Sequence, residues 1–313
     1  MDGGWSAGRA LRKPVMGLVV AGPLVAVGYA IFALWNRMVG WQDIALLTTI
    51  YLLVGLGVTI GYHRLLTHGS LNARRPVKIA LLILGTMSIQ GRPISWAANH
   101  RLHHARSDRE GDPHSPNLNR NAIVGFAHAH LGWLFQRGQA ADEGRWARDL
   151  LNDPDVVFIN RLAPVWFLAA LVIPFAIGGW SGLLWGGLVR ISLTHHATWS
   201  VNSVCHVFGS RAFSPKDQSR NHWLVGLLAL GEGGHNTHHA SPRSARHGLR
   251  WWHFDLSWVV ICALQEVRLI RDVYTLDAQD LKRALQTKAS GVKVALRHRL
   301  PQETRQTIAA VAD

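Results

Sequence analysis

The stretch IALLTTIYLLVGLGVTIGYHRLLTH, residues 44–68, joins an uncharged apolar segment to a pair of histidines. Residues 44–62 contain no Asp, Glu, Lys or Arg. A helix needs roughly 20 apolar residues to cross the hydrocarbon core of a bilayer, and this segment has about that length. We therefore expect a membrane-spanning helix that delivers His63 and His68 to one membrane surface.

Other apolar segments extend this pattern along the chain. Residues 14–35 are also uncharged and long enough to span. The uncharged run 162–189 is long for one crossing and short for two, and GGWSG at 178–182 interrupts it with turn residues. We expect a hairpin there, with limbs of about 163–177 and 183–201. The predicted fold is an all-α integral membrane protein with four transmembrane helices in two hairpins and a cytoplasmic helical cap.

The charge of the chain fits this membrane reading. The sequence has 313 residues and a formal net charge of +14. A basic protein can bind nucleic acid, but no basic stripe with interleaved aromatic residues is present, so we expect no nucleic-acid partner. Cytoplasmic segments of membrane proteins collect Lys and Arg. We expect one membrane domain over 1–275, a basic tail over 276–313, and cytoplasmic termini in a bacterial inner membrane.

Histidines form three clusters outside the apolar runs. HRLLTH contains His63 and His68, HRLHH contains His100, His103 and His104, and HNTHH contains His235, His238 and His239. Positions i, i+3 and i+4 share one face of a helix, so each of the last two clusters presents its imidazoles to one point. Positions i and i+5 are about 140° apart on an ideal helix. The first cluster therefore predicts a helix that ends or bends, and Gly69 favours an end.

The three clusters can meet only if they lie on one side of the membrane. Residues 77–90 are too short to span, so we expect an interfacial or packed helix there. The last limb would then carry Arg190, His195 and His196, which we expect to face protein or the membrane interface because such side chains are costly in lipid. Cys205 and Cys262 predict no disulfide framework.

The clusters favour a metal centre. Imidazole suits iron, zinc and copper. Eight histidines exceed the four ligands of a structural zinc site, so two metals with four or five ligands each fit better. Carboxylates are scarce among the clusters, unlike in the glutamate-rich di-iron bundles. We assign no role to five isolated histidines, which are His128, His130, His247, His253 and His298.

Several flanking segments resemble the membrane fatty-acid desaturases, and most closely the stearoyl-CoA (Δ9) desaturase family. They are YHRLLTH, WAANHRLHHARSDREGDPHSP, HLGW, ATWSVNSVCHVFGSR and GEGGHNTHHASP, and the resemblance covers roughly 44–275. It implies two iron ions held by nine histidines, with Asn202 reaching the metal through water. The implied iron ligands are His63, His68, His100, His103, His104, His206, His235, His238 and His239.

The same resemblance implies a substrate tunnel. Gln90, Trp96 and Thr198 match residues that line the bend holding the acyl chain near the irons. Tyr51 matches a position towards the closed end of the tunnel, and Arg137 lies near a basic position that is a candidate phosphate contact.

One departure concerns the acyl carrier. Animal members carry Arg-Asp immediately before H-x-x-H-H, where those residues contact coenzyme A, whereas this chain has Ala98 and Asn99. Acyl-CoA is the expected thioester substrate, and acyl-carrier protein or a lipid-linked acyl group is the alternative.

The implied reaction uses O2 and two external electrons to introduce a cis double bond, at Δ9, into a saturated acyl chain. The chain has neither a His-Pro-Gly-Gly segment like that of cytochrome b5 nor a CxxC-type iron–sulfur pattern. We therefore expect a separate donor, such as ferredoxin or cytochrome b5 with its reductase, at the cytoplasmic face.

Two other functions fit parts of the pattern. A di-iron hydroxylase acting on lipid or hydrocarbon would differ only in the fate of the substrate radical. A membrane metal transporter or sensor would instead favour ligands near mid-membrane, whereas these clusters lie at span ends.

Overall fold

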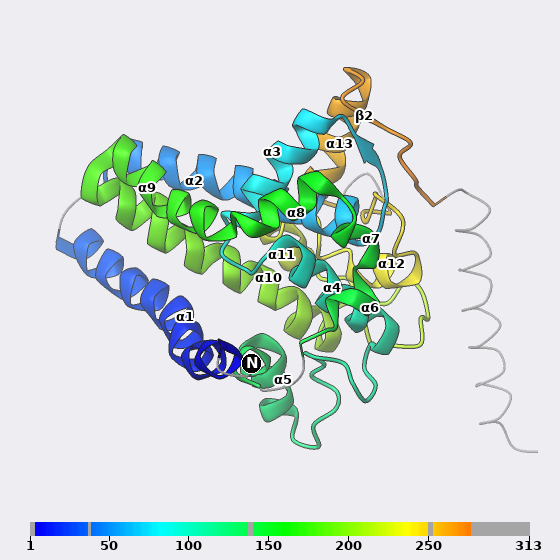
Figure 1. The fold of residues 1–313 in the computed structure, drawn as a ribbon. Helices are drawn as coiled ribbons and strands as arrows, with labels where there is room; N and C mark the ends of the chain where they lie inside the picture. The colour runs from blue at the N-terminus through cyan, green and yellow to red at the C-terminus, as the bar shows by residue number, and fades with distance from the viewer. Residues whose placement is uncertain (1–3, 37–38, 137–139, 250–252, 277–313) are drawn as a thin grey trace, which may run out of the picture.

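The computed structural model describes residues 4–36, 39–136, 140–249 and 253–276. Most of them are helical, and long helices extend from a cap built of shorter ones (Figure 1). The α-helices are α1 (Gly4–Asn36), α2 (Trp41–Leu56), α3 (Arg75–Thr86), α4 (Pro93–Arg106), α5 (Ala122–His130), α6 (Glu143–Trp146), α7 (Arg148–Leu151), α8 (Pro154–Arg161), α9 (Ala163–Gly182), α10 (Arg190–Val207), α11 (Trp223–Leu228), α12 (His235–Ala240) and α13 (Leu256–Glu266).

Shorter and wider helical segments complete the fold. η1 (Gly57–Thr67) and η3 (Leu183–Val189) are π-helices that continue α2 and lead into α10, and η2 (Gly132–Phe135) is a 3₁₀-helix. The small strands β1 (Asn72–Ala73) and β2 (Ile270–Arg271) pair antiparallel and tie the end of the described chain to the cap.

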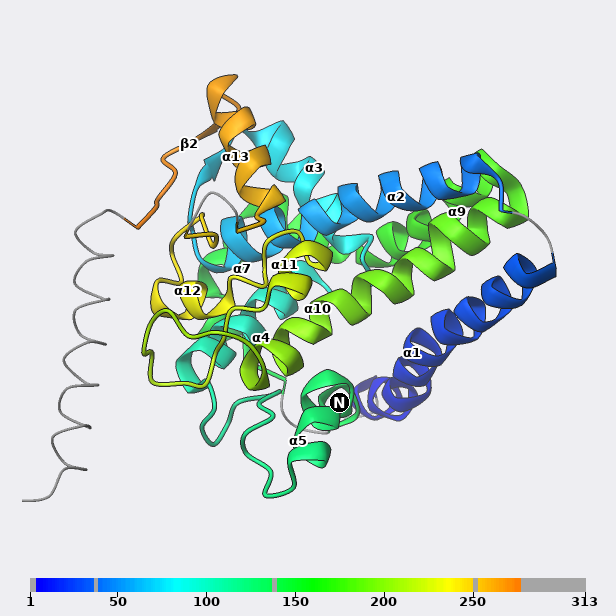
Figure 2. The same ribbon diagram turned by 180° about the vertical axis from the view of Figure 1, so that it is seen from behind.

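Within the described ranges, three helical segments are long and apolar enough to cross a membrane. They are Lys13–Ala33, Trp41–Thr67 and Ala163–Val207. The last one reverses direction at Gly179, whose φ is +60°. Arg190 Nη2 on one limb donates a hydrogen bond to the carbonyl oxygen of Ala170 on the other, at 3.1 Å. The expected hairpin is therefore present, and its limbs lie side by side in both ribbon views (Figure 2).

The first histidine cluster lies on a wider helix than we predicted. The expectation was that the helix ends or bends between His63 and His68, but η1 continues through this region as a π-helix. Its i→i+5 hydrogen bonds place the two residues one turn apart, and the amide of His68 donates to the carbonyl of His63 at 3.2 Å. Gly69 follows with a φ of +56° and ends the helix, as expected.

A close helix contact fixes η1 against α3. A Cβ atom added at Gly57 would lie 2.3 Å from the backbone nitrogen of Gly85, and one at Gly85 would lie 2.8 Å from the carbonyl oxygen of Gly57. Only glycine allows this approach of two backbones, as at other small-residue helix contacts. The packed helix that we expected over 77–90 is thus α3, which ends at Thr86.

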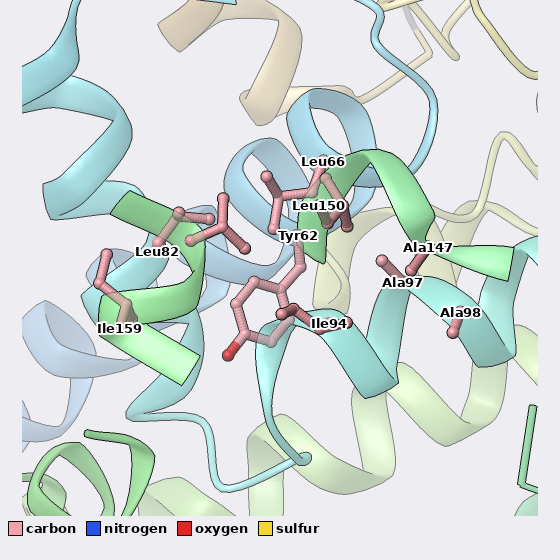
Figure 3. Close-up of a cluster of buried hydrophobic side chains, with 10 residues drawn as sticks. Tyr62, Leu66, Leu82, Ile94, Ala97, Ala98, Ala147, Leu150 and Ile159 are labelled. Atoms are coloured by element: carbon pink, nitrogen blue, oxygen red, sulfur yellow. The ribbon is translucent and has the colours of Figure 1, made fainter. Parts of the chain in front are cut away.

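A hydrophobic cluster lies behind the histidines. Tyr62, next to His63, is completely buried among Leu82, Ile94 and Ile159, which come from α3, α4 and α8 (Figure 3). Its hydroxyl lies 2.7 Å from Thr86 Oγ1. Full burial of such a side chain stabilises a fold by roughly 2 kcal/mol. Tyr62 therefore anchors η1 and orients the histidine beside it.

The polar side chains on the second limb of the hairpin face protein, as predicted. Arg190 and His195 are buried, and both donate hydrogen bonds to backbone carbonyls. His196 is half-buried, with its Nδ1 3.0 Å from His130 Nε2. These polar groups face protein. Cys205 and Cys262 are both free.

Candidate metal centre

The nine predicted histidines meet in the cap, where they form two adjacent groups. The first consists of His63, His68, His100, His104 and His238, and the second of His103, His206, His235 and His239; within each group, one ring nitrogen per residue lies within 4.8 Å of all the others. The rings come from η1, its C-terminal cap, α4, α10 and α12. This division into five and four matches the ligand numbers expected for two metals.

The ring nitrogens of the first group converge on one point. Distances between Nε2 atoms are 3.0 Å for His63 and His238, 2.9 Å for His238 and His104, and 3.1 Å for His104 and His100. Two imidazole nitrogens that each lie about 2.1 Å from one ion, at a right angle to each other, are about 3.0 Å apart. The spacing thus fits ligands of a single metal ion.

The second group has the same character. His206 Nε2 and His235 Nε2 are 3.0 Å apart. The Nε2 atoms of His103 and His239 are buried, and neither has a hydrogen-bond partner among the described residues. A buried polar atom without a partner costs free energy, and a metal ion would satisfy both nitrogens.

Carboxylates orient several of these rings from behind. Asp112 Oδ1 accepts from His103 Nδ1 at 2.9 Å, and Asp217 Oδ2 accepts from His239 Nδ1 at 2.9 Å. Asp108 similarly accepts from His206 Nδ1 at 3.2 Å. A histidine that donates from Nδ1 keeps the lone pair of Nε2 for a metal, and such carboxylate–histidine pairs are typical of metal sites.

The first group is supported differently. Glu232 accepts from His63 Nδ1 at 2.6 Å and from Arg64 Nη1 at 2.5 Å. Arg64 is also paired with Asp255 at 3.2 Å, and His247 Nδ1 lies 3.5 Å from Glu232. All of these groups are buried. Burial alone would raise the pKa of Glu232, but the charges of Arg64 and His63 hold it well below its usual value.

The protonation states suit metal binding. Burial, followed by the charges of neighbouring histidines, lowers the pKa of His100, His104, His235, His238 and His239 well below 6.5. Neutral imidazole is the form that binds metal.

Asp112, one of the three aspartates behind the second group, is ionised. Burial would raise the pKa of Asp112, but the charge and hydrogen bond of His103 lower it to about 2. The second group therefore has an anionic acceptor at its back near neutral pH.

An apolar cavity ends beside both groups. Its lining includes His63 and His100 of the first group and His235 of the second. It extends to Met16 and Val19 of α1.

The described substrate residues predicted from the sequence also line this cavity. They are Tyr51, Gln90, Trp96 and Thr198, and Asn202 lines it as well. Gln90 Nε2 donates to Thr198 Oγ1 at 2.9 Å, and the Tyr51 hydroxyl donates to the carbonyl oxygen of Leu228 at 2.5 Å. Arg137 lies outside the described residues.

The two positions that depart from the animal pattern have internal roles. Ala98 is fully buried in the cluster around Tyr62 (Figure 3). The side chain of Asn99 donates to the carbonyl of Ser95 and accepts from the amide of Ala141, both at 2.9 Å. Its amide group therefore joins α4 to the segment before α6, and Asn99 also lines the cavity.

Sequence reasoning missed the carboxylates and left His247 without a role. The signal for three of them was present in the motifs that carry the resemblance. Asp108 and Asp112 lie four and eight residues after the last histidine of HRLHH, and Glu232 precedes His235 by three residues. Asp217 had no such signal, because it lies 22 residues from His239 in an irregular loop.

Comparison with known proteins agrees with this geometry. The model of the family described as fatty acid desaturase matches residues 40–261. An sn-1 stearoyl-lipid 9-desaturase of Anabaena variabilis is 38% identical over 79% of this chain and 90% of its own. A hex-5-enoyl-[acyl-carrier protein] acetylenase of Moorena producens is 37% identical over 80% and 83%, and an acyl-CoA 5-desaturase of Anemone leveillei is 40% identical over 74% and 72%. The chain therefore belongs to the fatty acid desaturase family.

Proposed function

We propose that this protein introduces a cis double bond, at Δ9, into a saturated fatty acyl chain, with O2 as oxidant and two electrons from an external donor. The observation that carries the proposal is the apolar cavity that ends beside both histidine groups. An acyl chain in that cavity would bring a pair of methylene groups to the metal centre.

The nine histidines are the proposed ligands of two iron ions. The first group would hold one ion and the second the other, and Asn202 would reach the centre through water. Iron supplies the oxidation of an unactivated C–H bond, which acid–base groups of a protein do not achieve. The reaction removes two hydrogens from adjacent carbons and, with two electrons and two protons, reduces O2 to two waters.

The contribution of the protein is position and exclusion of water. Gln90, Trp96 and Thr198 line the cavity close to His100 and hold its wall in one shape. Such fixed placement favours one pair of carbons over its neighbours. The apolar wall keeps bulk water from the oxidant.

The membrane arrangement that we propose has four spans. They would be α1, α2 with η1, α9, and η3 with α10, and this arrangement would put all nine histidines at one membrane surface. The excess of Lys and Arg favours the cytoplasm for that surface, and we propose a bacterial inner membrane. Residues 1–275 would form one domain; the tail 277–313 lies outside the described residues. The electron donor, ferredoxin or cytochrome b5 with its reductase, would bind on the cytoplasmic side.

The acyl carrier that we propose is a membrane lipid, in place of the acyl-CoA expected from the sequence. Two observations support it. Ala98 and Asn99 are engaged inside the cap, at the positions where animal members contact coenzyme A. The cavity also reaches Met16 and Val19 on α1, a helix long enough to span the membrane.

Product analysis tests the proposal. Membranes from cells that express the chain should contain acyl groups that have lost two hydrogens, and fragmentation by mass spectrometry should place the double bond. In vitro, lipid-linked, CoA-linked and carrier-protein-linked acyl chains are compared, and the lipid should be converted fastest. Gain of one oxygen would identify a hydroxylase, and unchanged acyl chains under every condition would contradict the proposal.

A further inference from the structure

A buried arginine on α10 binds only main-chain oxygens among the described residues. Arg190 has 0% of its surface exposed. Its guanidinium donates to the carbonyl oxygens of Met87 at 3.0 Å, Ala170 at 3.1 Å and Gly186 at 3.2 Å. A buried guanidinium is expensive unless its donors are satisfied. Its planar fork therefore ties three segments together at fixed distances.

The next two turns of α10 contact the residues that follow Met87. His195 Nε2 donates to the carbonyl oxygen of Ser88 at 2.9 Å, and Thr198 Oγ1 accepts from Gln90 Nε2 at 2.9 Å. Together with the bond from Arg190 to Met87, these contacts fix three of the four residues Met87–Gln90. The segment connects α3 to α4, and α4 carries three of the clustered histidines.

This segment forms part of the cavity wall and has a strained backbone. Ile89, Gln90 and Gly91 line the cavity, and so does His195, whereas Arg190 does not appear in its lining. Ile89 has a φ of +59°, a region that β-branched residues rarely adopt. Such a conformation persists only where the surroundings enforce it, and it concentrates at functional sites. The contacts from α10 provide that enforcement.

We infer that Arg190 is a positioning residue that sets the regiochemistry of the reaction, and that His195 contributes both through its bond to Ser88 and as part of the cavity wall. By fixing the carbonyls of Met87 and Ser88, they determine where Ile89 and Gln90 stand in the cavity. The acyl chain packs against these two side chains, so their position decides which carbons lie beside the histidine groups. This inference rests on the proposed function.

The test compares neighbouring residues of one helix. Arg190→Lys keeps the charge but loses the fork, and His195→Gln shortens the reach to Ser88. His196→Gln is the matched control, because His196 contacts His130 and is absent from the cavity lining. In purified, metal-loaded protein, Arg190→Lys and His195→Gln should each shift the ratio of neighbouring double-bond isomers about fivefold, the factor that one net hydrogen bond provides. Arg190→Lys decides the positioning role, because Arg190 lies outside the cavity lining, whereas His195→Gln also changes the cavity wall itself. His196→Gln should leave the ratio unchanged.

Hydrogen exchange of the amides of Ser88, Ile89 and Gln90 gives a second readout that does not depend on turnover. Exchange should become faster in both variants and stay unchanged in the control. The inference is overturned if isomer ratios and exchange both match those of the unmodified protein. It is also overturned if activity falls only in proportion to folded, metal-loaded protein while the double-bond position is constant. An unmodified protein that forms no double bond would contradict the proposed function instead, and the exchange measurement would still decide whether α10 fixes the segment.

Discussion

The two histidine groups lie side by side but are supported by different chemistry. Behind the four-histidine group stand three aspartates, Asp108, Asp112 and Asp217, each bound to the Nδ1 of one ligand. The five-histidine group has one carboxylate contact of this kind, from Glu232, whose charge is balanced by Arg64. The aspartates give the ligands of the four-histidine group negatively charged partners. Glu232 instead forms a buried ion pair with Arg64 that is also part of the protein core.

The carboxylate–histidine contacts of the two groups should therefore differ in what they stabilise. Carboxylates that hydrogen-bond to ligands increase ligand basicity and fix the ring tautomer. Glu232 does this for His63 and also neutralises a buried arginine. We therefore expect changes around the four-histidine group to act mainly on metal affinity, whereas changes around Glu232 also act on folding.

The largest effect should come from removal of a histidine, and the two groups should respond differently. His103→Ala leaves three ligands in its group, whereas His104→Ala leaves four. Both variants should lose double-bond formation, because each substitution removes a ligand from one of the two ions and the reaction needs both. Only His103→Ala should lower the metal content from about two to about one ion per chain, since His104→Ala still leaves four ring nitrogens around its ion and His103→Ala leaves three. Metal analysis of purified protein checks this.

His128→Ala is the control for these variants. His128 belongs to neither group and lies 3.3 Å from the side-chain nitrogen of Gln136. It should keep both metal and activity. Equal metal loss in His103→Ala and His104→Ala would remove the distinction between the groups.

The next largest effect should be on stability, at Glu232. Glu232→Gln removes the anion that faces Arg64 and leaves that buried cation with Asp255 as its remaining carboxylate partner. Breaking a buried ion pair typically costs about 3 kcal/mol or more. Thermal unfolding in detergent should show this loss in the metal-free protein as well as in the loaded one.

Asp112→Asn is the comparison variant, because within the described part of the chain Asp112 contacts two histidines and two backbone amides and no arginine or lysine. Its unfolding in the metal-free state should change less than that of Glu232→Gln. Equal destabilisation of the two metal-free variants would contradict the separate function of the arginine-balanced site.

The histidines were predictable because spacing carries their geometry. H-x-x-H-H places three rings on one helix face, and α4 and α12 both use it. The hairpin was predictable because glycines interrupt an uncharged run. The π-helix was not predictable, since residues five apart, such as His63 and His68, point in different directions on an ordinary α-helix. Nothing local in the sequence reports that the helix has widened, and its close contact through Gly57 and Gly85 appears only in three dimensions.

Other site residues could not be predicted because they have no local sequence pattern. His206 was identified only through the resemblance, because a single histidine after an apolar run has no pattern of its own. Asp217 reaches His239 from a loop, so its role depends on tertiary structure. Arg190 was predicted to face protein, but its contact with Met87 spans 103 residues and could not be read from spacing.

A smaller effect should follow from Asp112→Asn on metal binding. The substitution keeps the shape but removes the charge that holds the Nδ1 proton of His103. Loss of such a supporting contact costs about 10- to 100-fold in metal affinity or activity. Competition with a chelator should show weaker retention of one ion and normal retention of the other. Asp272→Asn, at an exposed aspartate beside Arg271, should change neither.

The smallest effect should appear at Asn202, which has no direct ligand role in our proposal. It lies one helical turn before His206 on α10 and lines the cavity, and it is not among the nine clustered histidines. Asn202→Ala should keep both ions and lower turnover about five- to tenfold, the range expected when one water-mediated hydrogen bond is lost. Ser203→Ala, at the next residue, removes a contact with His130 and should leave turnover nearly unchanged. Loss of an ion from Asn202→Ala would mean that Asn202 binds metal directly, so that the four-histidine group would have a fifth protein ligand and the two groups would be alike in ligand number.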